Sequence, residues 1–115
     1  MMLNGVIFNG TRILAPEVVR YMTRDHLGMI SMSDPDQPPA GIGFGLGFAV
    51  MKDPAEAGYM SSEGSFFWAG AANTHFWIDP KEDLVVVAMT QHMGVPTADA
   101  SWQQIRTLVY SALQN

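Results

Sequence analysis

The amino-acid sequence predicts a single α+β domain in which helices flank an antiparallel sheet. The chain has 115 residues, which is the length of one domain. Hydrophobic residues make up 48% of it and charged residues 15%, which is enough apolar material for a core and unlike a disordered acidic tail. Short apolar runs separated by turn residues occupy most of the chain, and an amphipathic helical pattern follows them.

A turn and a short helix are expected first. Asn9-Gly10 is the strongest two-residue turn signal, and apolar residues precede and follow it. Pro16 suits the first position of a helix. An acidic residue in the first turn and arginines towards the end predict a helix over residues 16–26. Prolines and aspartates then make residues 31–40 a loop.

An alternation of glycine with bulky apolar residues occupies residues 41–48. A period of two is typical of a β-strand, so we expect one strand from Gly41 to about Met51. One face of this strand would be bare, and a bare glycine face usually means that another backbone or a ligand approaches closely. The four glycines are Gly41, Gly43, Gly45 and Gly47.

Three further strands are predicted after a polar loop over residues 52–64. Residues 65–70 and 74–78 are rich in aromatic side chains, and a turn of small residues separates them. A charged hairpin loop over residues 79–83 leads to a run at 84–89 that is apolar without alternation. Such a run suits a strand that is covered on both faces.

The last predicted element is an amphipathic helix that begins near Asp99 or Ser101, either of which can serve as its N-cap. One side carries an apolar stripe that would pack on the sheet, while Arg106 and the glutamines lie off it. The stripe consists of Trp102, Ile105, Leu108, Val109, Ala112 and Leu113. One long helix and one short helix do not cover both faces of a sheet, so part of the cover is expected to be missing.

Composition excludes several classes of function. Six Lys plus Arg against eleven Asp plus Glu give a net charge of −5, so no basic surface is expected for nucleic acid. The absence of cysteine excludes disulfides, thiolate metal sites and a cysteine nucleophile. No apolar run reaches the ~18 residues of a membrane span. The histidines, His26, His75 and His92, show no metal-ligand spacing, and the glycines fit no nucleotide-binding motif, so neither metal nor cofactor is expected.

The serines lie in none of the usual nucleophile motifs. None occurs in Gly-x-Ser-x-Gly, and none is followed three residues later by lysine. A triad of Ser65, His75 and Asp79 is disfavoured, because Ser65 begins a strand and Asp79 begins a turn.

An aromatic cluster surrounds a run of small residues between two predicted strands. Phe66–Trp68 precede Gly70–Asn73, and His75–Trp77 follow. The aromatic residues favour a plain hairpin whose side chains belong to the core. Small residues at a strand end also let a substrate approach the backbone, where an N–H group can stabilise an oxyanion. From the residues alone, both interpretations stay open.

At this cluster the sequence resembles serine hydrolases of the β-lactamase superfamily, above all class C β-lactamases and family VIII carboxylesterases. Residues 65–80, which read SFFWAGAANTHFWIDP, and residues 83–87, which read DLVVV, carry the resemblance. Residues 2–23, the glycine-rich strand and the final helix are also similar to the C-terminal third of that family. The resemblance implies the C-terminal portion of the serine β-lactamase and penicillin-binding-protein-like fold.

The family uses three motifs, and the third lies on a strand beside the pocket. It is Lys-Thr-Gly in lactamases and often Trp-x-Gly in the esterases; here it reads Trp68-Ala69-Gly70. The lysine would hold a β-lactam carboxylate, so its absence favours esters over lactams. The resemblance also implies that the Ala71 N–H is one of two oxyanion-hole donors. Trp68 would line the acyl pocket, and His75 is a candidate for the pocket rim.

The departures from the family pattern concern the nucleophile. The chain holds no Ser-x-x-Lys, none of its three tyrosines begins a Tyr-x-Asn, and Asn73 stands where glycine is expected. We therefore expect residues 1–115 to form a single partial domain, the C-terminal segment of a longer serine hydrolase that is inactive alone. Its partners would be a small-molecule ester or lactam in the full-length enzyme, with self-association through an open sheet edge or a missing N-terminal part. The alternatives are a stand-alone, non-catalytic oligomeric module and a split enzyme whose second chain carries the nucleophile.

Overall fold

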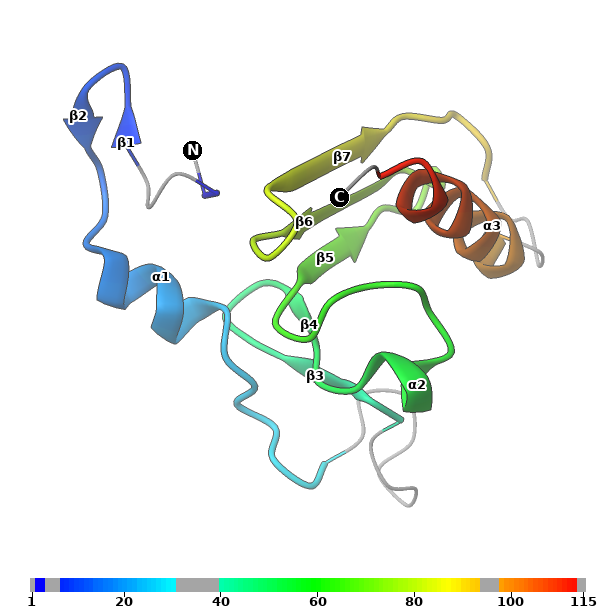
Figure 1. The fold of residues 1–115 in the computed structure, drawn as a ribbon, viewed down its shortest axis with the longest axis horizontal. Helices are drawn as coiled ribbons and strands as arrows, with labels where there is room; N and C mark the ends of the chain where they lie inside the picture. Colours follow the sequence, from blue (N-terminus) through cyan, green and yellow to red (C-terminus); the bar gives the residue numbers. More distant parts are fainter. Residues whose placement is uncertain (1, 4–6, 31–39, 94–97, 114–115) are drawn as a thin grey trace.

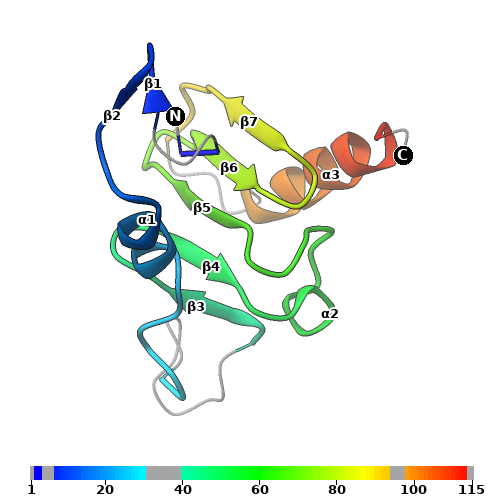
Figure 2. The ribbon, with the colours of Figure 1, turned by 60° about the vertical axis from the view of Figure 1, so that its left-hand side comes forward.

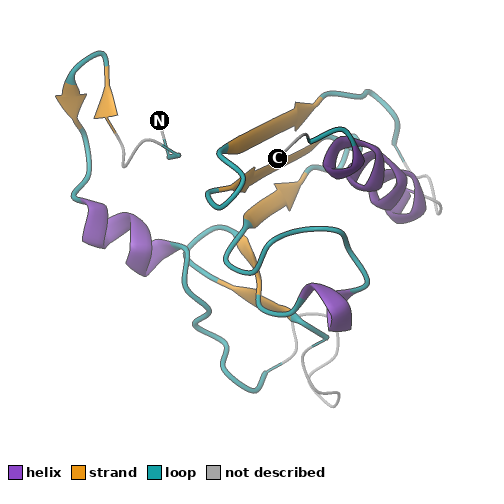
Figure 3. Ribbon diagram, viewed as in Figure 1, coloured by secondary structure: helices purple, strands orange, loops and turns teal. Residues whose placement is uncertain are grey.

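The computed structural model describes residues 2–3, 7–30, 40–93 and 98–113. A five-stranded antiparallel sheet forms its centre, and a separate two-stranded hairpin lies to one side (Figures 1 and 3). This arrangement confirms the α+β class. The elements are β1 Ile7–Phe8, β2 Thr11–Arg12, α1 Pro16–Met22, β3 Ile42–Phe44, β4 Ala49–Met51, α2 Pro54–Ala57, β5 Phe66–Ala69, β6 His75–Asp79, β7 Leu84–Ala88 and α3 Ala98–Ser111.

The strands of the main sheet lie in the order β3-β4-β5-β6-β7, each antiparallel to the next (Figure 2). Trp68 pairs with Phe76, which pairs with Val87, so these three side chains share one face. Strand β4 pairs only with Phe66 and Phe67 of β5. The Trp68–Ala69 half of β5 is therefore a sheet edge within the described part of the chain.

The two faces of the sheet are covered unequally. Helix α3 lies over one face (Figure 1), where Trp102 and Arg106 are each 5% exposed. On the other face, Val85 and Val87 of β7 are 50% and 63% exposed. The prediction that this strand is covered on both faces is wrong for the described residues, because they supply a long helix on one side only. A small core on the open face consists of Val50, Phe66 and Ile78, with Met2, Leu3, Phe48 and Phe76 packed against it.

The predicted single strand over residues 41–51 is a hairpin made of β3 and β4. The N–H of Gly45 donates to the carbonyl of Phe48 at 2.7 Å, and Gly47 takes a positive φ of 93°, so the glycines that suggested continuity provide the turn instead. The expected close approach to the glycine face is confirmed. A Cβ on Gly43 would collide with the side chain of Asp25, and one on Gly45 with the carbonyl of Met22.

The predicted turn at Asn9-Gly10 is confirmed, and it joins two short strands, β1 and β2, that are not among the predicted elements. Asn9 and Gly10 take φ values of 48° and 78° in the β1–β2 turn, as a type I′ turn requires. Helix α1 begins at Pro16 but ends at Met22 rather than His26. The reason is that the chain after α1 pairs with the sheet, where the N–H of His26 donates to the carbonyl of Phe44 at 2.8 Å.

Two details of the later elements differ from expectation. The predicted loop at 52–64 contains α2, because the Asp53 carboxylate accepts from the first backbone N–H groups of a helical turn at 2.8 and 3.2 Å. On α3, Leu108 is 70% exposed and Arg106 is buried, the reverse of the predicted stripe. With 14 residues, α3 is the longest helix described, and no described helix has the length and apolarity needed to cross a membrane.

Candidate active site

The residues that sequence analysis singled out meet at the edge where β5 ends. A shallow pocket of about 210 Å³ opens there, and Trp68 stands in it with 42% of its surface exposed. The predicted residues Trp68, Ala69, Gly70 and His75 line the pocket, and Ala71 follows in the adjoining turn. The full lining is Trp68, Ala69, Gly70, Thr74, His75, Phe76, Val87 and Met89.

Two residues give this pocket its shape. The indole of Trp68 is held on one side by an edge-to-face contact with Phe44, at a centroid distance of 5.1 Å. Gly70 is exposed, and its lack of a side chain gives room to Thr74, since a Cβ on Gly70 would collide with the Thr74 hydroxyl. An apolar ring beside exposed backbone is therefore the local environment that a ligand would meet.

Two of the backbone N–H groups in the turn after β5 are hydrogen-bonded within it, while those of Ala71, Ala72 and Thr74 have no acceptor among the described residues. The N–H of Gly70 donates to the carbonyl of Thr74 at 2.8 Å, and that of Asn73 donates to the carbonyl of Gly70 at 3.0 Å. Among the described residues nothing accepts a hydrogen bond from the N–H of Ala71. An unpaired donor in a fixed turn can stabilise negative charge that develops on a bound oxygen.

Asn73 occupies the position where glycine was expected, and its backbone explains the expectation. Its φ is 60°, in the left-handed region that glycine adopts most easily and asparagine tolerates. The Oδ1 atom of Asn73 accepts a hydrogen bond from the Nε1–H of Trp102 at 2.6 Å. No local sequence pattern indicates this contact, since 29 positions separate the two residues.

The end of β7 supports the same turn. The hydroxyl of Thr90 lies 2.9 Å from the carbonyl oxygen of Ala72 and 2.6 Å from that of Asn73, so its one proton serves one or both. The N–H of His92 donates to the carbonyl of Ala72 at 3.1 Å. Together with Trp102 on α3, the segment after β7 thus holds the turn by hydrogen bonds.

His75 lines the pocket but turns its ring towards α3. It pairs with Ala69 across the strands and so faces away from Trp68. Its ring centroid lies 4.1 Å from that of Trp102. It also borders a second, smaller hollow of about 40 Å³, whose lining is Tyr59, Phe67, His75, Trp102 and Arg106.

The disfavoured triad does not form. His75 and Asp79 are the first and last residues of β6 and therefore lie at opposite ends of the strand. Ser65 is fully buried, and its hydroxyl lies 2.6 Å from that of Ser61. None of the three side chains thus has the triad partner that acyl transfer would need.

Asp79 instead belongs to a buried polar network under α3. Its carboxylate accepts from the hydroxyl of Tyr110 at 2.7 Å and from the N–H of Ser62 at 3.1 Å. Burial alone would raise the pKa of Asp79, but these hydrogen bonds outweigh it and hold the pKa below its ordinary value. Burial, reinforced by Asp79, raises the pKa of Tyr110 to about 12. The network fastens α3 to the end of β6.

Arg106 is the polar residue that sequence analysis placed on the wrong side of the helix. Its guanidinium lies over the rings of Phe67 and Trp77, at 4.6 and 4.8 Å from their centroids. Its Nη1 donates to the hydroxyl of Ser61 at 3.4 Å. The sequence signal that could have indicated a buried Arg106 is the run of aromatic residues on β5 and β6, because aromatic rings accept a cation on their faces.

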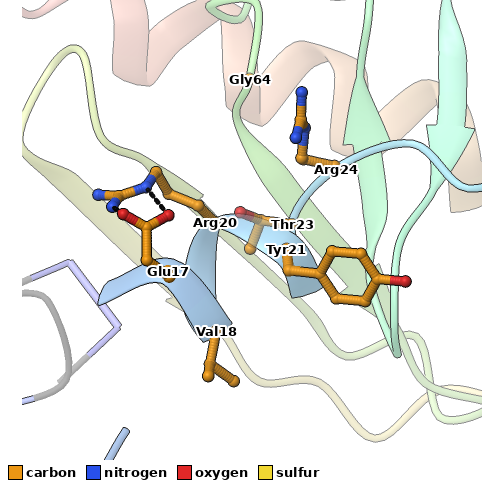
Figure 4. A pocket seen from close by; sticks show the side chains of 7 residues that line it. All are labelled: Glu17, Val18, Arg20, Tyr21, Thr23, Arg24 and Gly64. Atoms are coloured by element: carbon orange, nitrogen blue, oxygen red, sulfur yellow. Dashed lines mark hydrogen bonds and ion pairs between the residues drawn. The ribbon is translucent and has the colours of Figure 1, made fainter. Parts of the chain in front are cut away.

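A larger open cavity of about 800 Å³ lies along α1, apart from this site. Figure 4 shows Glu17 and Arg20 bound to each other on its wall, with Arg24 further along. Across the described ranges, no group of three or more His, Asp or Glu side chains has an arrangement that could hold a metal ion. The pocket beside Trp68 therefore remains the site that the sequence and the geometry both indicate.

Comparison with known proteins identifies the family. The model of the beta-lactamase family matches residues 8–110, which is most of the chain. The chain belongs to the beta-lactamase family. Protein Rv1367c of Mycobacterium tuberculosis strain H37Rv is 32% identical to it over 112 residues, a match that covers 88% of this chain and 27% of that protein. The chain thus spans about a quarter of the length of the relatives it matches.

Solved structures agree with the family and confirm the expected beta-lactamase-like fold. EstCE1, described as a hydrolase with promiscuous acyltransferase activity, is 31% identical with a TM-score of 0.71, covering 88% of this chain and 26% of EstCE1. A beta-lactamase from Mycobacterium bovis, Mb2281c, has a TM-score of 0.70 at 24% identity, covering 96% and 39%. Simvastatin synthase LovD from Aspergillus terreus has a TM-score of 0.70 at 21% identity, and the match covers 98% of this chain and 32% of LovD. The last two likenesses show the fold alone.

Proposed function

We propose that this chain forms one wall of the acyl-transfer site of a serine hydrolase that acts on small-molecule esters. The observation that carries the proposal is the N–H of Ala71, which has no acceptor among the described residues and lies in the turn next to the pocket lined by Trp68 and Gly70. Membership of the beta-lactamase family and the similarity to EstCE1 support it.

The chemistry follows from where charge develops. When a serine attacks an ester carbonyl, the carbonyl oxygen becomes an oxyanion, and on this proposal the Ala71 N–H donates to it. The absence of an acceptor for this N–H among the described residues supports the assignment. The second donor is proposed to be the N–H of the attacking serine. Trp68 provides an apolar surface for the acyl group. It also replaces the cation that would attract a β-lactam carboxylate, so esters are favoured over lactams.

The nucleophile is proposed to lie outside this sequence. No Ser-x-x-Lys occurs among the 115 residues, so the serine and its lysine base would come from elsewhere in a longer hydrolase. On this proposal residues 1–115 form a partial domain, the C-terminal segment of the enzyme, and are unreactive alone. A split enzyme, in which a second chain supplies the serine, uses the same wall.

A chimera tests the proposal. Replacing the matched segment of EstCE1 with this chain should give a protein that hydrolyses p-nitrophenyl esters and is labelled on its serine by a phosphonate probe. Ala71→Pro, which removes the N–H, should lower kcat by about 10²–10³-fold. Ala71→Gly keeps the N–H and serves as the matched control. Unchanged kcat in Ala71→Pro, or stoichiometric labelling of the 115-residue chain by itself, would overturn the proposal.

The second candidate is a non-catalytic module that associates through its uncovered sheet face. The observation in its favour is the exposure of Val85 and Val87 on β7. It predicts a stable oligomer from the chain alone and no ester hydrolysis by the chimera.

A further inference from the structure

We propose that Asn73 and Trp102 are positioning residues that fix the Ala71 N–H through the contact between their side chains. The inference rests on the proposed function for its catalytic consequence, although the contact itself is independent of it. Helix α3, which lies on the opposite face of the sheet from Trp68, would thereby control the geometry of the oxyanion donor.

The backbone of Asn73 lies in the left-handed region, with a φ of 60°. This conformation is unfavourable for most residues that carry a side chain, whereas glycine adopts it freely. Asparagine offsets this cost here by placing its Oδ1 against the indole N–H of Trp102 at 2.6 Å. The side chain thus secures a backbone conformation that glycine would adopt without being held in it.

Trp102 is 5% exposed. A buried indole N–H usually has a hydrogen-bond acceptor, and that of Trp102 donates to Asn73. The ring of Trp102 is also stacked near that of His75, with a centroid distance of 4.1 Å. Because His75 follows the turn directly on β6, Trp102 contacts both the turn and the strand that leaves it.

Further hydrogen bonds restrain the rest of the turn. The carbonyls of Ala72 and Asn73 accept from Thr90, and the Gly70 N–H is bound to Thr74. The turn is therefore restrained on both sides of Ala71, while the Ala71 N–H is left for a ligand. Its alignment with a developing oxyanion affects the transition state more than the bound ester, so loosening the contact should lower kcat and leave KM nearly unchanged.

Amide hydrogen exchange of the 115-residue chain tests the contact without any catalysis. Asn73→Gly and Trp102→Phe each remove one partner of the hydrogen bond between the side chains at positions 73 and 102. Each should therefore loosen the turn and lower the protection of the Gly70 amide about tenfold. Asn73→Asp keeps the acceptor and should retain protection. Asn9→Gly, in the other turn with a left-handed asparagine, and Gln103→Ala, next to Trp102 and exposed, should leave Gly70 unaffected.

Full protection of Gly70 in both Asn73→Gly and Trp102→Phe would overturn the proposal. If Trp102→Phe fails to fold, the comparison of Asn73→Gly with Asn73→Asp decides, because position 73 lies at a half-buried turn. Equal loss of protection in those two variants would also contradict it.

Kinetics of the EstCE1 chimera test the catalytic consequence. Asn73→Gly and Trp102→Phe should each lower kcat about tenfold with KM within about twofold, and the double variant should be no slower than either single variant. Additive losses, or a rise in KM at constant kcat, would refute a shared positioning role. Absence of esterase activity in the unsubstituted chimera would refute the proposed function, while the exchange data would still judge the contact.

Discussion

Asp79, under α3, connects more segments of the fold than its place at the start of a turn suggests. Asp79 was expected only to begin a turn, and it does so by accepting from the N–H of Lys81 at 3.0 Å. The same carboxylate also receives the hydroxyl of Tyr110 and the N–H of Ser62. One side chain therefore joins the β6–β7 turn, the segment before β5 and the final helix. Removing it would leave several partly buried donors without this acceptor.

The Tyr110–Asp79 hydrogen bond should give stability a specific dependence on alkaline pH. The pKa of Tyr110 is raised from 10.0 to about 12, so its contribution is complete below pH 10 and is lost as the pH rises to about 12. At pH 7, Tyr110→Phe should lower the unfolding free energy by about 1 kcal/mol. The difference between wild type and variant should shrink between pH 10 and 12 in urea titrations. A difference that stays constant across this range would contradict the assignment.

Residue by residue, the sequence located the candidate site but not what holds it. The turn from Gly70 to Asn73 could be placed because small residues between aromatic strands have few other uses. The side-chain partner of Asn73 could not, because it lies on a helix far along the chain and depends on how that helix packs. The burial of Arg106 could not be predicted for a similar reason. A charged residue is expected to be exposed unless the aromatic rings that face it in the fold are known.

At the scale of elements, the end of α1 and the segment after it pack against the glycine-containing β3–β4 hairpin. This contact joins β1, β2 and α1 to the main sheet. Backbone carbonyls from this segment occupy the space where a side chain on Gly45 would lie. The carbonyl of Met22 also accepts from the N–H of Leu46 at 2.8 Å. The absence of a side chain at position 45 is thus a packing requirement of the β3–β4 hairpin.

Gly45→Ala should therefore destabilise the chain by about 1–3 kcal/mol, because the colliding atoms are backbone and cannot rotate away. The φ of Gly45 is not positive, so the loss would come from contact and not from backbone strain. Urea unfolding measures the change. Leu46→Ala, at the adjacent residue that is 49% exposed, should alter stability by no more than about 0.5 kcal/mol. Equal stability of Gly45→Ala and the parent chain would contradict this packing.

Element types were more predictable than element boundaries. Turn chemistry and apolar runs indicated β5, β6, β7 and α3, since these signals are local. The glycine alternation misled because glycine supports both an extended strand and the positive φ of a turn. The early end of α1 depends on pairing with β3, which no local pattern reveals.

At the scale of the whole molecule, the unequal cover of the sheet is the dominant feature. One face carries α3, and the other exposes apolar side chains from two strands and the segment after them. These include Trp68, Val85, Val87 and Met89. Within the described ranges, strand β7 is also an edge of the sheet, and edge strands offer backbone groups for pairing. An apolar face beside an open edge favours association with another surface.

We expect the 115-residue chain to self-associate, with an apparent mass in sedimentation velocity that rises with protein concentration. Val87→Lys should reduce this association, because it places a charge on the open face at the edge strand. Leu108→Lys changes an equally exposed apolar residue on α3, at 70% exposure, and should have little effect. Equal suppression by both variants would point to a general effect of charge instead of this face.

The order of the strands has a consequence for how the molecule forms. Each strand of the main sheet pairs with its neighbour in sequence. Pairing β5 with β6 and β6 with β7 therefore requires closure of short loops only, residues 70–74 and 80–83. Loop closure costs little entropy at such lengths, and local pairing is associated with rapid folding. We expect the hairpins to assemble before α3 docks. The turn that presents Ala71 would then arise in the fast, local phase, and the arrival of Trp102 would set its final precision in a later one.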